Sequence, residues 1–131
     1  MTSSGRASRR NIRILLVEDD ADDVWVMRNL LGDRWDGPFE LVHVELLSAG
    51  IARCDEQPFD VVLLDLSLPD SHGLETFMTM HARIGDVPIV VLSGYADEAT
   101  AVKAVQAGAQ DYLVKGQVDD KIGRASCRER V

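Results

Sequence analysis

Five polar side chains of this sequence each stand directly after a short apolar run, and together they could carry out one kind of chemistry. They are two adjacent carboxylates, a single carboxylate, a hydroxyl and an ammonium, contributed by Glu18 and Asp19, Asp65, Ser93 and Lys115. Clustered carboxylates repel one another unless a cation offsets their charge, and ligand sets made only of oxygen favour a hard ion such as Mg²⁺. An ammonium and a hydroxyl beside the same carboxylate suit a phosphoryl group. The set therefore predicts a magnesium-assisted phosphoryl site centred on Asp65.

The run that ends at Asp65 is the one around which the other elements are arranged. Residues 61–64 are four consecutive apolar residues, two of them β-branched, which are too few for a buried helix and suit a strand covered on both faces. Residues 66–73 are then expected to form a loop. In open α/β sheets, ligands bind at this carboxyl edge of the strands. Asp65 is therefore either a reactive group or merely a cap for the loop.

Strands and helices are predicted to alternate along the chain. The apolar runs place strands at 12–17, 39–44, 61–65, 88–92 and 112–114. Helical spacing of apolar residues indicates helices between them, with inward faces at Val24, Met27 and Leu31; at Leu74, Phe77, Met80 and Ile84; and at Ala99, Val102 and Val105. This alternation predicts a parallel sheet with helices on both faces, so that residues at the strand ends converge at one edge.

Polar residues and glycines mark the expected helix ends. Asp20 or Asp22 is expected to cap the first helix, Ser48 a short helix through Cys54, and Asp97 the helix that Gly108 ends. Any one Asp at a strand end is more often such a cap than a nucleophile, and a lone Lys after a strand is usually a surface charge. The phosphoryl interpretation depends on the whole set of five residues, because their coincidence on four strand ends is improbable.

Composition limits the remaining possibilities. The chain has 131 residues, enough for one domain with a single core, which we expect at 11–120 after a disordered arm at 1–10. Residues 11–120 contain 21 acidic and 7 basic side chains, a net charge of −14 that argues against nucleic-acid binding through this domain. The sequence has two cysteines, no run long enough for a membrane helix and no secretion signal. We therefore expect a cytoplasmic protein with no membrane contact.

Four motifs of the chain, in order, resemble those of the receiver domains of two-component response regulators. They are Val-Glu-Asp-Asp at 17–20; Val-Val-Leu-Leu-Asp at 61–65 with Leu-Ser-Leu-Pro at 66–69 and Gly73; Val-Leu-Ser-Gly at 91–94; and Tyr-Leu-Val-Lys at 112–115. The resemblance runs from about residue 12 to residue 118. It implies a flavodoxin-like (βα)5 fold, doubly wound, whose five-stranded parallel sheet has the order 2-1-3-4-5.

The resemblance also implies a role for each site residue. Asp65 would accept a phosphoryl group from the phosphohistidine of a partner kinase or phosphotransfer protein. Asp19, Asp65 and the main-chain carbonyl of Ser67 would ligate Mg²⁺, with Glu18 acting largely through water. Such a domain is a signalling switch, and it acts as a catalyst only in its own phosphorylation and dephosphorylation.

Three further residues would read out the phosphorylated state. Lys115 would pair with the phosphoryl oxygens, and Ser93 would donate a hydrogen bond to one of them. Tyr112 would swing inward as Ser93 moves, reshaping the face around the fourth helix and the fifth strand, where an output domain or target protein could bind.

The sequence departs from the family pattern after Lys115. Gly116 stands where most receivers have a proline in a cis peptide, and we expect a trans bond because a cis bond before a non-proline residue costs about 2.5–4 kcal/mol. Residues 121–131 lack a strong apolar face for the expected last helix, and they resemble a translated sequencing adapter. Our hypothesis is that the natural sequence stops near Asp120 and that the last helix is truncated or replaced.

Two other functions compete with the signalling switch. An aspartyl-nucleophile phosphatase of the haloacid-dehalogenase type normally has a second acid two residues after the nucleophile, where this chain has Ser67. An interaction module that is never phosphorylated would have no need of the acidic pair, the hydroxyl and the lysine together.

Overall fold

The computed structural model describes residues 11–34 and 37–115, and its centre is a five-stranded sheet. The strands are β1 (Ile12–Val17), β2 (Phe39–Val44), β3 (Val61–Asp65), β6 (Ile89–Ser93) and β7 (Asp111–Val114). Their order is β2-β1-β3-β6-β7, and every neighbouring pair is parallel. Counted along the chain, this is the order 2-1-3-4-5, so the flavodoxin-like fold expected from the sequence is confirmed.

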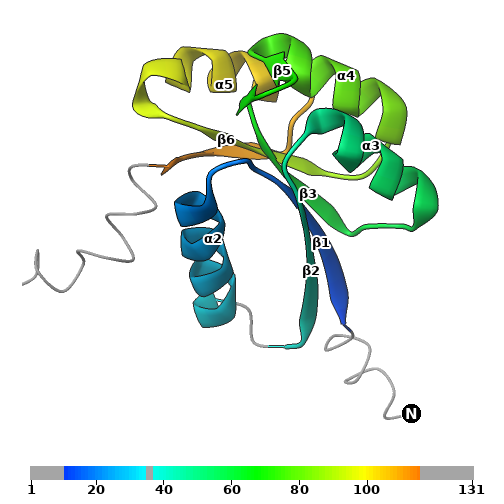
Figure 1. The fold of residues 1–131 in the computed structure, drawn as a ribbon. Helices are drawn as coiled ribbons and strands as arrows, with labels where there is room; N and C mark the ends of the chain where they lie inside the picture. The colour runs from blue at the N-terminus through cyan, green and yellow to red at the C-terminus, as the bar shows by residue number, and fades with distance from the viewer. Residues whose placement is uncertain (1–10, 35–36, 116–131) are drawn as a thin grey trace, which may run out of the picture.

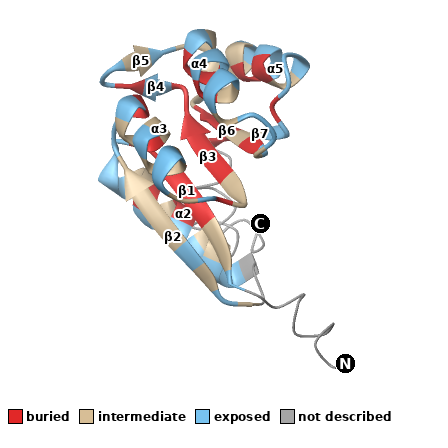
Figure 2. Ribbon diagram, turned by 90° about the vertical axis from the view of Figure 1, so that its right-hand side faces the viewer, coloured by how far each residue is buried: buried red, intermediate tan, exposed pale blue. Residues whose placement is uncertain are grey.

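Helices cover both faces of the sheet (Figure 1). One face carries α2 (Ala21–Arg34), and the other carries α3 (Leu47–Glu56), α4 (Leu74–Ile84) and α5 (Glu98–Gln106). Successive residues of a strand point to opposite faces, so Leu15 joins the core under α3, α4 and α5 while Leu16 joins the core under α2. Figure 2 shows that burial is concentrated along the central strands. The edge of these strands is therefore a rigid platform for a site.

The segment that follows β3 has more structure than the loop expected from the sequence. It forms a small antiparallel hairpin from β4 (Ser67–Leu68) and β5 (Ser71–His72). Pro69 and Asp70 make its turn, and Gly73 then begins α4 with a φ of +83°, a backbone conformation that favours glycine. Two-residue strands of this kind carry no period that a sequence pattern could reveal.

The predicted helix caps have mixed outcomes. Asp20 caps α2, because its Oδ1 accepts the N–H groups of Asp22 and Asp23 at 2.8 and 3.3 Å. The prediction for Ser48 is wrong: it lies inside α3, whose first N–H groups donate instead to the Asp70 carboxylate. Asp97 occupies the N-cap position of α5 but makes no capping hydrogen bond with its side chain. A cap that comes from a loop distant in the sequence, as Asp70 does for α3, could therefore not be predicted from the local pattern.

The inward face predicted for α5 is also partly wrong. Ala99 and Val102 are exposed, and the buried residues are Ala101 and Ala104, with Val105 half-buried. Two sets of apolar residues with helical spacing overlap in this segment: Ala99, Val102 and Val105 form one, and Ala101, Ala104 and Val105 form the other. The 3₁₀ turn at Tyr95–Asp97 sets the start of α5, and the side turned toward the sheet is the one with the smaller side chains.

Several other expectations concern residues that the structure does not describe. The arm at 1–10, the tail at 121–131, the last helix and the peptide bond to Gly116 all lie outside the described residues. Within the described part of the chain, no helix combines the length and the apolar character that crossing a bilayer requires.

Candidate functional site

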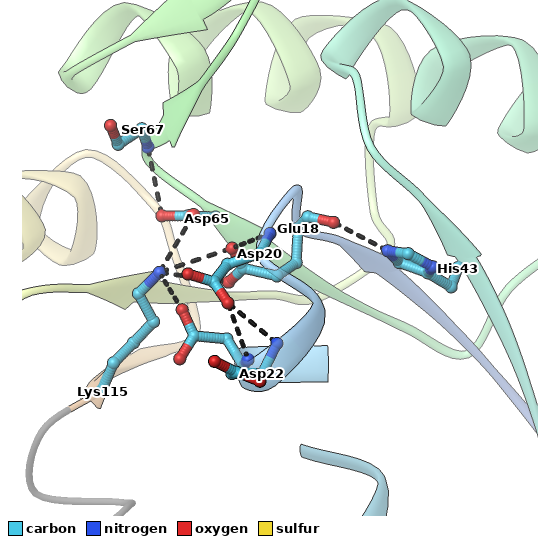
Figure 3. A network of polar contacts seen from close by, with 8 residues as sticks. Glu18, Asp20, Asp22, His43, Asp65, Ser67 and Lys115 are labelled. Carbon is cyan, nitrogen blue, oxygen red and sulfur yellow. Dashed lines mark hydrogen bonds and ion pairs between the residues drawn. The ribbon is translucent and has the colours of Figure 1, made fainter. Parts of the chain in front are cut away.

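The five polar residues singled out in the sequence lie at the carboxyl edge of the sheet. Glu18 and Asp19 follow β1, Asp65 ends β3, Ser93 ends β6 and Lys115 follows β7. Glu18, Asp65 and Ser93 are almost completely buried, with exposed fractions of 0%, 2% and 1%. The parallel register brings together residues that are up to 97 positions apart in the sequence, and Figure 3 shows Glu18, Asp65 and Lys115 joined in one network.

Lys115 lies at the centre of this network. Its Nζ donates to Glu18 Oε1 at 3.2 Å and Oε2 at 3.4 Å, and to Asp65 Oδ2 at 3.1 Å. A third carboxylate, Asp23 Oδ2 in the first turn of α2, lies at 2.9 Å. Sequence reasoning did not single out Asp23. Its position in the first turn after a strand end, three residues beyond the cap Asp20, was the only available signal.

The electrostatics of the site favour added positive charge. Burial, followed by the neighbouring Asp65 carboxylate, raises the pKa of Glu18 to about 8, although Lys115 partly opposes this shift. Burial would lower the pKa of Lys115, but the Asp23, Asp65 and Glu18 carboxylates outweigh it and raise that pKa above its ordinary value. Lys115 therefore stays charged, and the buried Glu18 carboxyl holds a proton readily because the carboxylates outnumber the cation facing them.

The carboxylates of the site form a set that could hold a metal ion. One oxygen from each of Glu18, Asp19 and Asp65 lies within 4.8 Å of the other two. Asp19 is exposed while the other two are buried, so the group opens toward solvent on one side. An oxygen-only set with three carboxylates fits a hard divalent cation such as Mg²⁺. The donor chemistry therefore agrees with the cofactor expected from the sequence.

The backbone around Asp65 and Glu18 is held by local hydrogen bonds. The N–H of Ser67 donates to Asp65 Oδ1 at 3.1 Å, so Ser67 lies beside the carboxylate. The N–H of Asp20 donates to Glu18 Oε2 at 3.2 Å. His43 on β2 places Nε2 at 2.7 Å from the main-chain carbonyl of Glu18, a contact that no pattern in the sequence predicted.

Ser93 and Tyr112 differ in how their hydroxyl groups are satisfied. Ser93 Oγ is buried and has no hydrogen-bond partner among the residues that the structure describes. Such an orphan group is rare and suits a site that receives an additional acceptor. The Tyr112 hydroxyl donates to Glu98 Oε2 at 2.9 Å, and this bond raises the pKa of Tyr112. Tyr112 thus contacts α5 and lies half-buried, in a position from which the expected swing would have to break that bond.

Comparison with known proteins identifies the family. Residues 14–125 match the family model of the response regulator receiver domain. The chain belongs to this family. The receiver is 33% identical over 104 residues to the cell cycle transcriptional regulator CtrA of Caulobacter vibrioides, covering 79% of this chain and 44% of that protein. It is 36% identical over 108 residues to the acid tolerance regulatory protein ActR of Rhizobium meliloti, covering 82% of this chain and 55% of that protein. This chain thus spans about half the length of these relatives.

Solved structures agree with the receiver fold. The phosphorylated cyanobacterial phytochrome response regulator RcpA superposes with a TM-score of 0.67 at 23% identity, covering 88% of this chain and 97% of that one. The Mn²⁺-bound form of the response regulator Rcp1 gives a TM-score of 0.68 at 22% identity, covering 85% and 93%. At these identities the likeness supports the fold.

Proposed function

We propose that this receiver is a phosphorylation-dependent switch in which Asp65 accepts a phosphoryl group with the help of Mg²⁺. The observation that carries the proposal is the gathering around Asp65 of an ammonium at 3.1 Å and two further carboxylates. The Ser93 hydroxyl, which has no partner among the described residues, lies at the same edge of the sheet. The family supplies independent support, since one similar structure is of a phosphorylated response regulator and another is of a Mn²⁺-bound one.

The transfer would proceed by displacement at phosphorus. An oxygen of the Asp65 carboxylate forms a bond to phosphorus, and the bond between phosphorus and the donor breaks. The donor leaves with the electron pair, as the imidazole nitrogen of a phosphohistidine or as acetate when acetyl phosphate is used. In the reverse direction of the switch, water attacks phosphorus and releases inorganic phosphate and the free carboxylate.

The residues around Asp65 would divide the work of stabilising the phosphoryl oxygens. Lys115 would donate to one oxygen and Ser93 to another, which would satisfy its buried hydroxyl. Asp19, Asp65 and the Ser67 carbonyl would hold Mg²⁺, with Glu18 acting through water. When bound, the cation supplies positive charge that offsets the charge on the transferring group. As Ser93 forms its hydrogen bond to the phosphoryl oxygen, the Tyr112 side chain would break its hydrogen bond to Glu98 and move inward.

The partners follow from the relatives. We infer that the donor is a sensor histidine kinase or phosphotransfer protein in the cytoplasm. The output would lie in a separate domain or target at the face made by α5 and β7, where Tyr112 contacts Glu98. The names of CtrA and ActR describe regulators, and this chain covers 44% and 55% of their lengths. The receiver would act as a catalyst only toward its own phosphorylation state.

Incubation with acetyl phosphate and Mg²⁺ followed by intact-mass measurement tests the proposal. We expect one added phosphoryl group, which disappears in Asp65→Asn and when EDTA removes the metal. Asp55→Asn is the matched control, because Asp55 is an exposed carboxylate that pairs with Arg83 on the helical surface. Equal labelling of the Asp65→Asn protein would refute the assignment, and steady turnover of small phosphomonoesters would favour a phosphatase instead.

A further inference from the structure

Lys115 has one partner that neither belongs to the predicted site nor takes part in the candidate metal group. Of its three carboxylate partners, Glu18 and Asp65 are buried in the group that could hold a metal, whereas the Asp23 side chain is 30% exposed on α2. The contact to Asp23 is also the shortest, at 2.9 Å against 3.1 and 3.2 Å. Asp23 therefore gives the ammonium a charged partner outside the candidate metal group.

A divalent cation and the Lys115 ammonium would share two carboxylates. Glu18 and Asp65 each contact Lys115, and each also offers an oxygen to the candidate metal group. A cation bound to these carboxylates would repel the ammonium and weaken its contacts with both. A half-buried ammonium that lost these partners and had no other would incur a desolvation penalty, which would oppose metal binding.

We propose that Asp23 is a positioning residue that keeps Lys115 at the site when a divalent cation occupies Glu18, Asp19 and Asp65. The ammonium retains one charged partner after displacement, so it remains next to the acceptor without blocking the cation. This inference rests on the metal site of the proposed function, and it adds a residue outside the four motifs. Phosphoryl transfer is not needed for it to hold.

The local structure fixes Asp23 for this task. Asp20 Oδ1 accepts the N–H groups of both Asp22 and Asp23, which holds the first turn of α2 against the end of β1. Lys115 is followed in the sequence by Gly116, the residue type that restricts the backbone least. Side-chain contacts must then contribute more to the orientation of the Lys115 side chain than they would if a conformationally restricted residue followed it.

Titration of the full chain with Mg²⁺ by calorimetry, with no phosphodonor present, tests the role of Asp23. We expect Asp23→Asn to weaken Mg²⁺ binding about threefold or more relative to Asp22→Asn. A change of this size in affinity corresponds to the free energy that one partly exposed ion pair contributes. Both variants remove one negative charge from the same turn of α2, and the exposed Asp22 forms no ion pair with Lys115 in the described structure. Asp23→Glu keeps the charge and should restore most of the affinity.

Repeating the comparison in a Lys115→Met background isolates the mechanism. The difference between Asp23→Asn and Asp22→Asn should disappear there, because no ammonium remains to be displaced. Equal affinities of the two variants in the native background, or a difference that persists without Lys115, would overturn the inference. If the unchanged chain binds no Mg²⁺, both this inference and the metal site fail. If it binds Mg²⁺ as described but takes no phosphoryl group, only the proposed function fails.

Discussion

The β4–β5 hairpin, which follows Asp65, is hydrogen-bonded to the start of α3 through one side chain, and a single substitution can remove these bonds. Asp70, in the turn of the β4–β5 hairpin, accepts the N–H of Leu47 at 2.8 Å and that of Ser48 at 3.0 Å. These are first-turn N–H groups of α3, which have no partner within their own helix. Asp70→Ala leaves both donors to water.

The expected loss follows from the chemistry of helix capping. Replacing a capping Asp by Ala costs about 1 kcal/mol, and water replaces part of the lost bonding because Asp70 is exposed. For a domain of this size we expect the melting temperature to fall by about 4 °C. Urea unfolding followed by circular dichroism measures the free energy directly, and Asp70→Asn, which keeps an acceptor oxygen, should lose much less.

Asp97→Ala is the matched control. Asp97 occupies the N-cap position of α5 without a capping bond, so its removal should change the free energy of unfolding by less than about 0.5 kcal/mol. If Asp97→Ala destabilises the protein as much as Asp70→Ala does, capping across the loop is not the cause and the reasoning is refuted.

The Asp70 effect also has a defined pH dependence. Burial is the largest single influence and raises the pKa of Asp70, but the hydrogen bonds from Ser48 and Leu47 together outweigh it and bring the pKa below its ordinary value of 3.8. A depressed pKa means that the carboxylate stabilises the fold above the unfolded value, and this contribution is lost as the pH falls through the folded value. The gap between the native chain and Asp70→Ala should therefore close in acid.

Four other substitutions give three separate tests. Gly50→Ala should lower the free energy of unfolding by about 1–3 kcal/mol in urea, because a Cβ there would lie 2.9 Å from Val17 Cγ2. Gly32→Ala should raise that free energy by about 0.5–1 kcal/mol, because a Cβ at Gly32 on α2 would point into open space. Glu18 has its pKa raised to about 8, so its contribution to stability in EDTA is present below its unfolded pKa and is lost as the pH rises through about 8; Glu18→Gln should flatten that decline. Ser93→Ala should leave the free energy of unfolding within about 0.5 kcal/mol, because its buried hydroxyl has no partner in the described structure, while labelling by acetyl phosphate slows.

The sequence determines the sheet and most of the site through patterns that are local. Each strand that leads to Glu18, Asp65 or Lys115 has its own apolar run, and a parallel arrangement places every such end at one edge. The strand order was expected from the resemblance to receiver domains, whereas the core helices follow from the alternation of strands and helices. The face of α5 does not, because two stripes with the same period overlap there and only packing against the sheet selects Ala101 and Ala104 over Val102.

The contacts that sequence reasoning missed all join segments that are distant along the chain. Asp70 lies 23 residues from the N–H of Leu47 that it accepts, and Asp23 lies 92 residues from Lys115. Asp70 lies in a hairpin turn and Asp23 in the first turn of a helix. Acidic residues are common at such positions in this acidic chain, so the sequence alone does not indicate which group they bind. Their roles appear only when the fold places a donor within reach.

Those long-range contacts explain how the clustered carboxylates are held together with no cation between them. Three carboxylates within 4.8 Å of one another would repel strongly, and two of them are buried. In the described structure the Lys115 ammonium contacts both buried carboxylates, and the raised pKa of Glu18 allows a proton to supply further positive charge. Lys115 thus acts as a counter-ion to the two buried carboxylates, and under the proposed function it would need another anion once a cation binds. Asp23 is the carboxylate that the fold places beside it, which is why its removal should be felt first in the binding of the cation and not in the stability of the sheet.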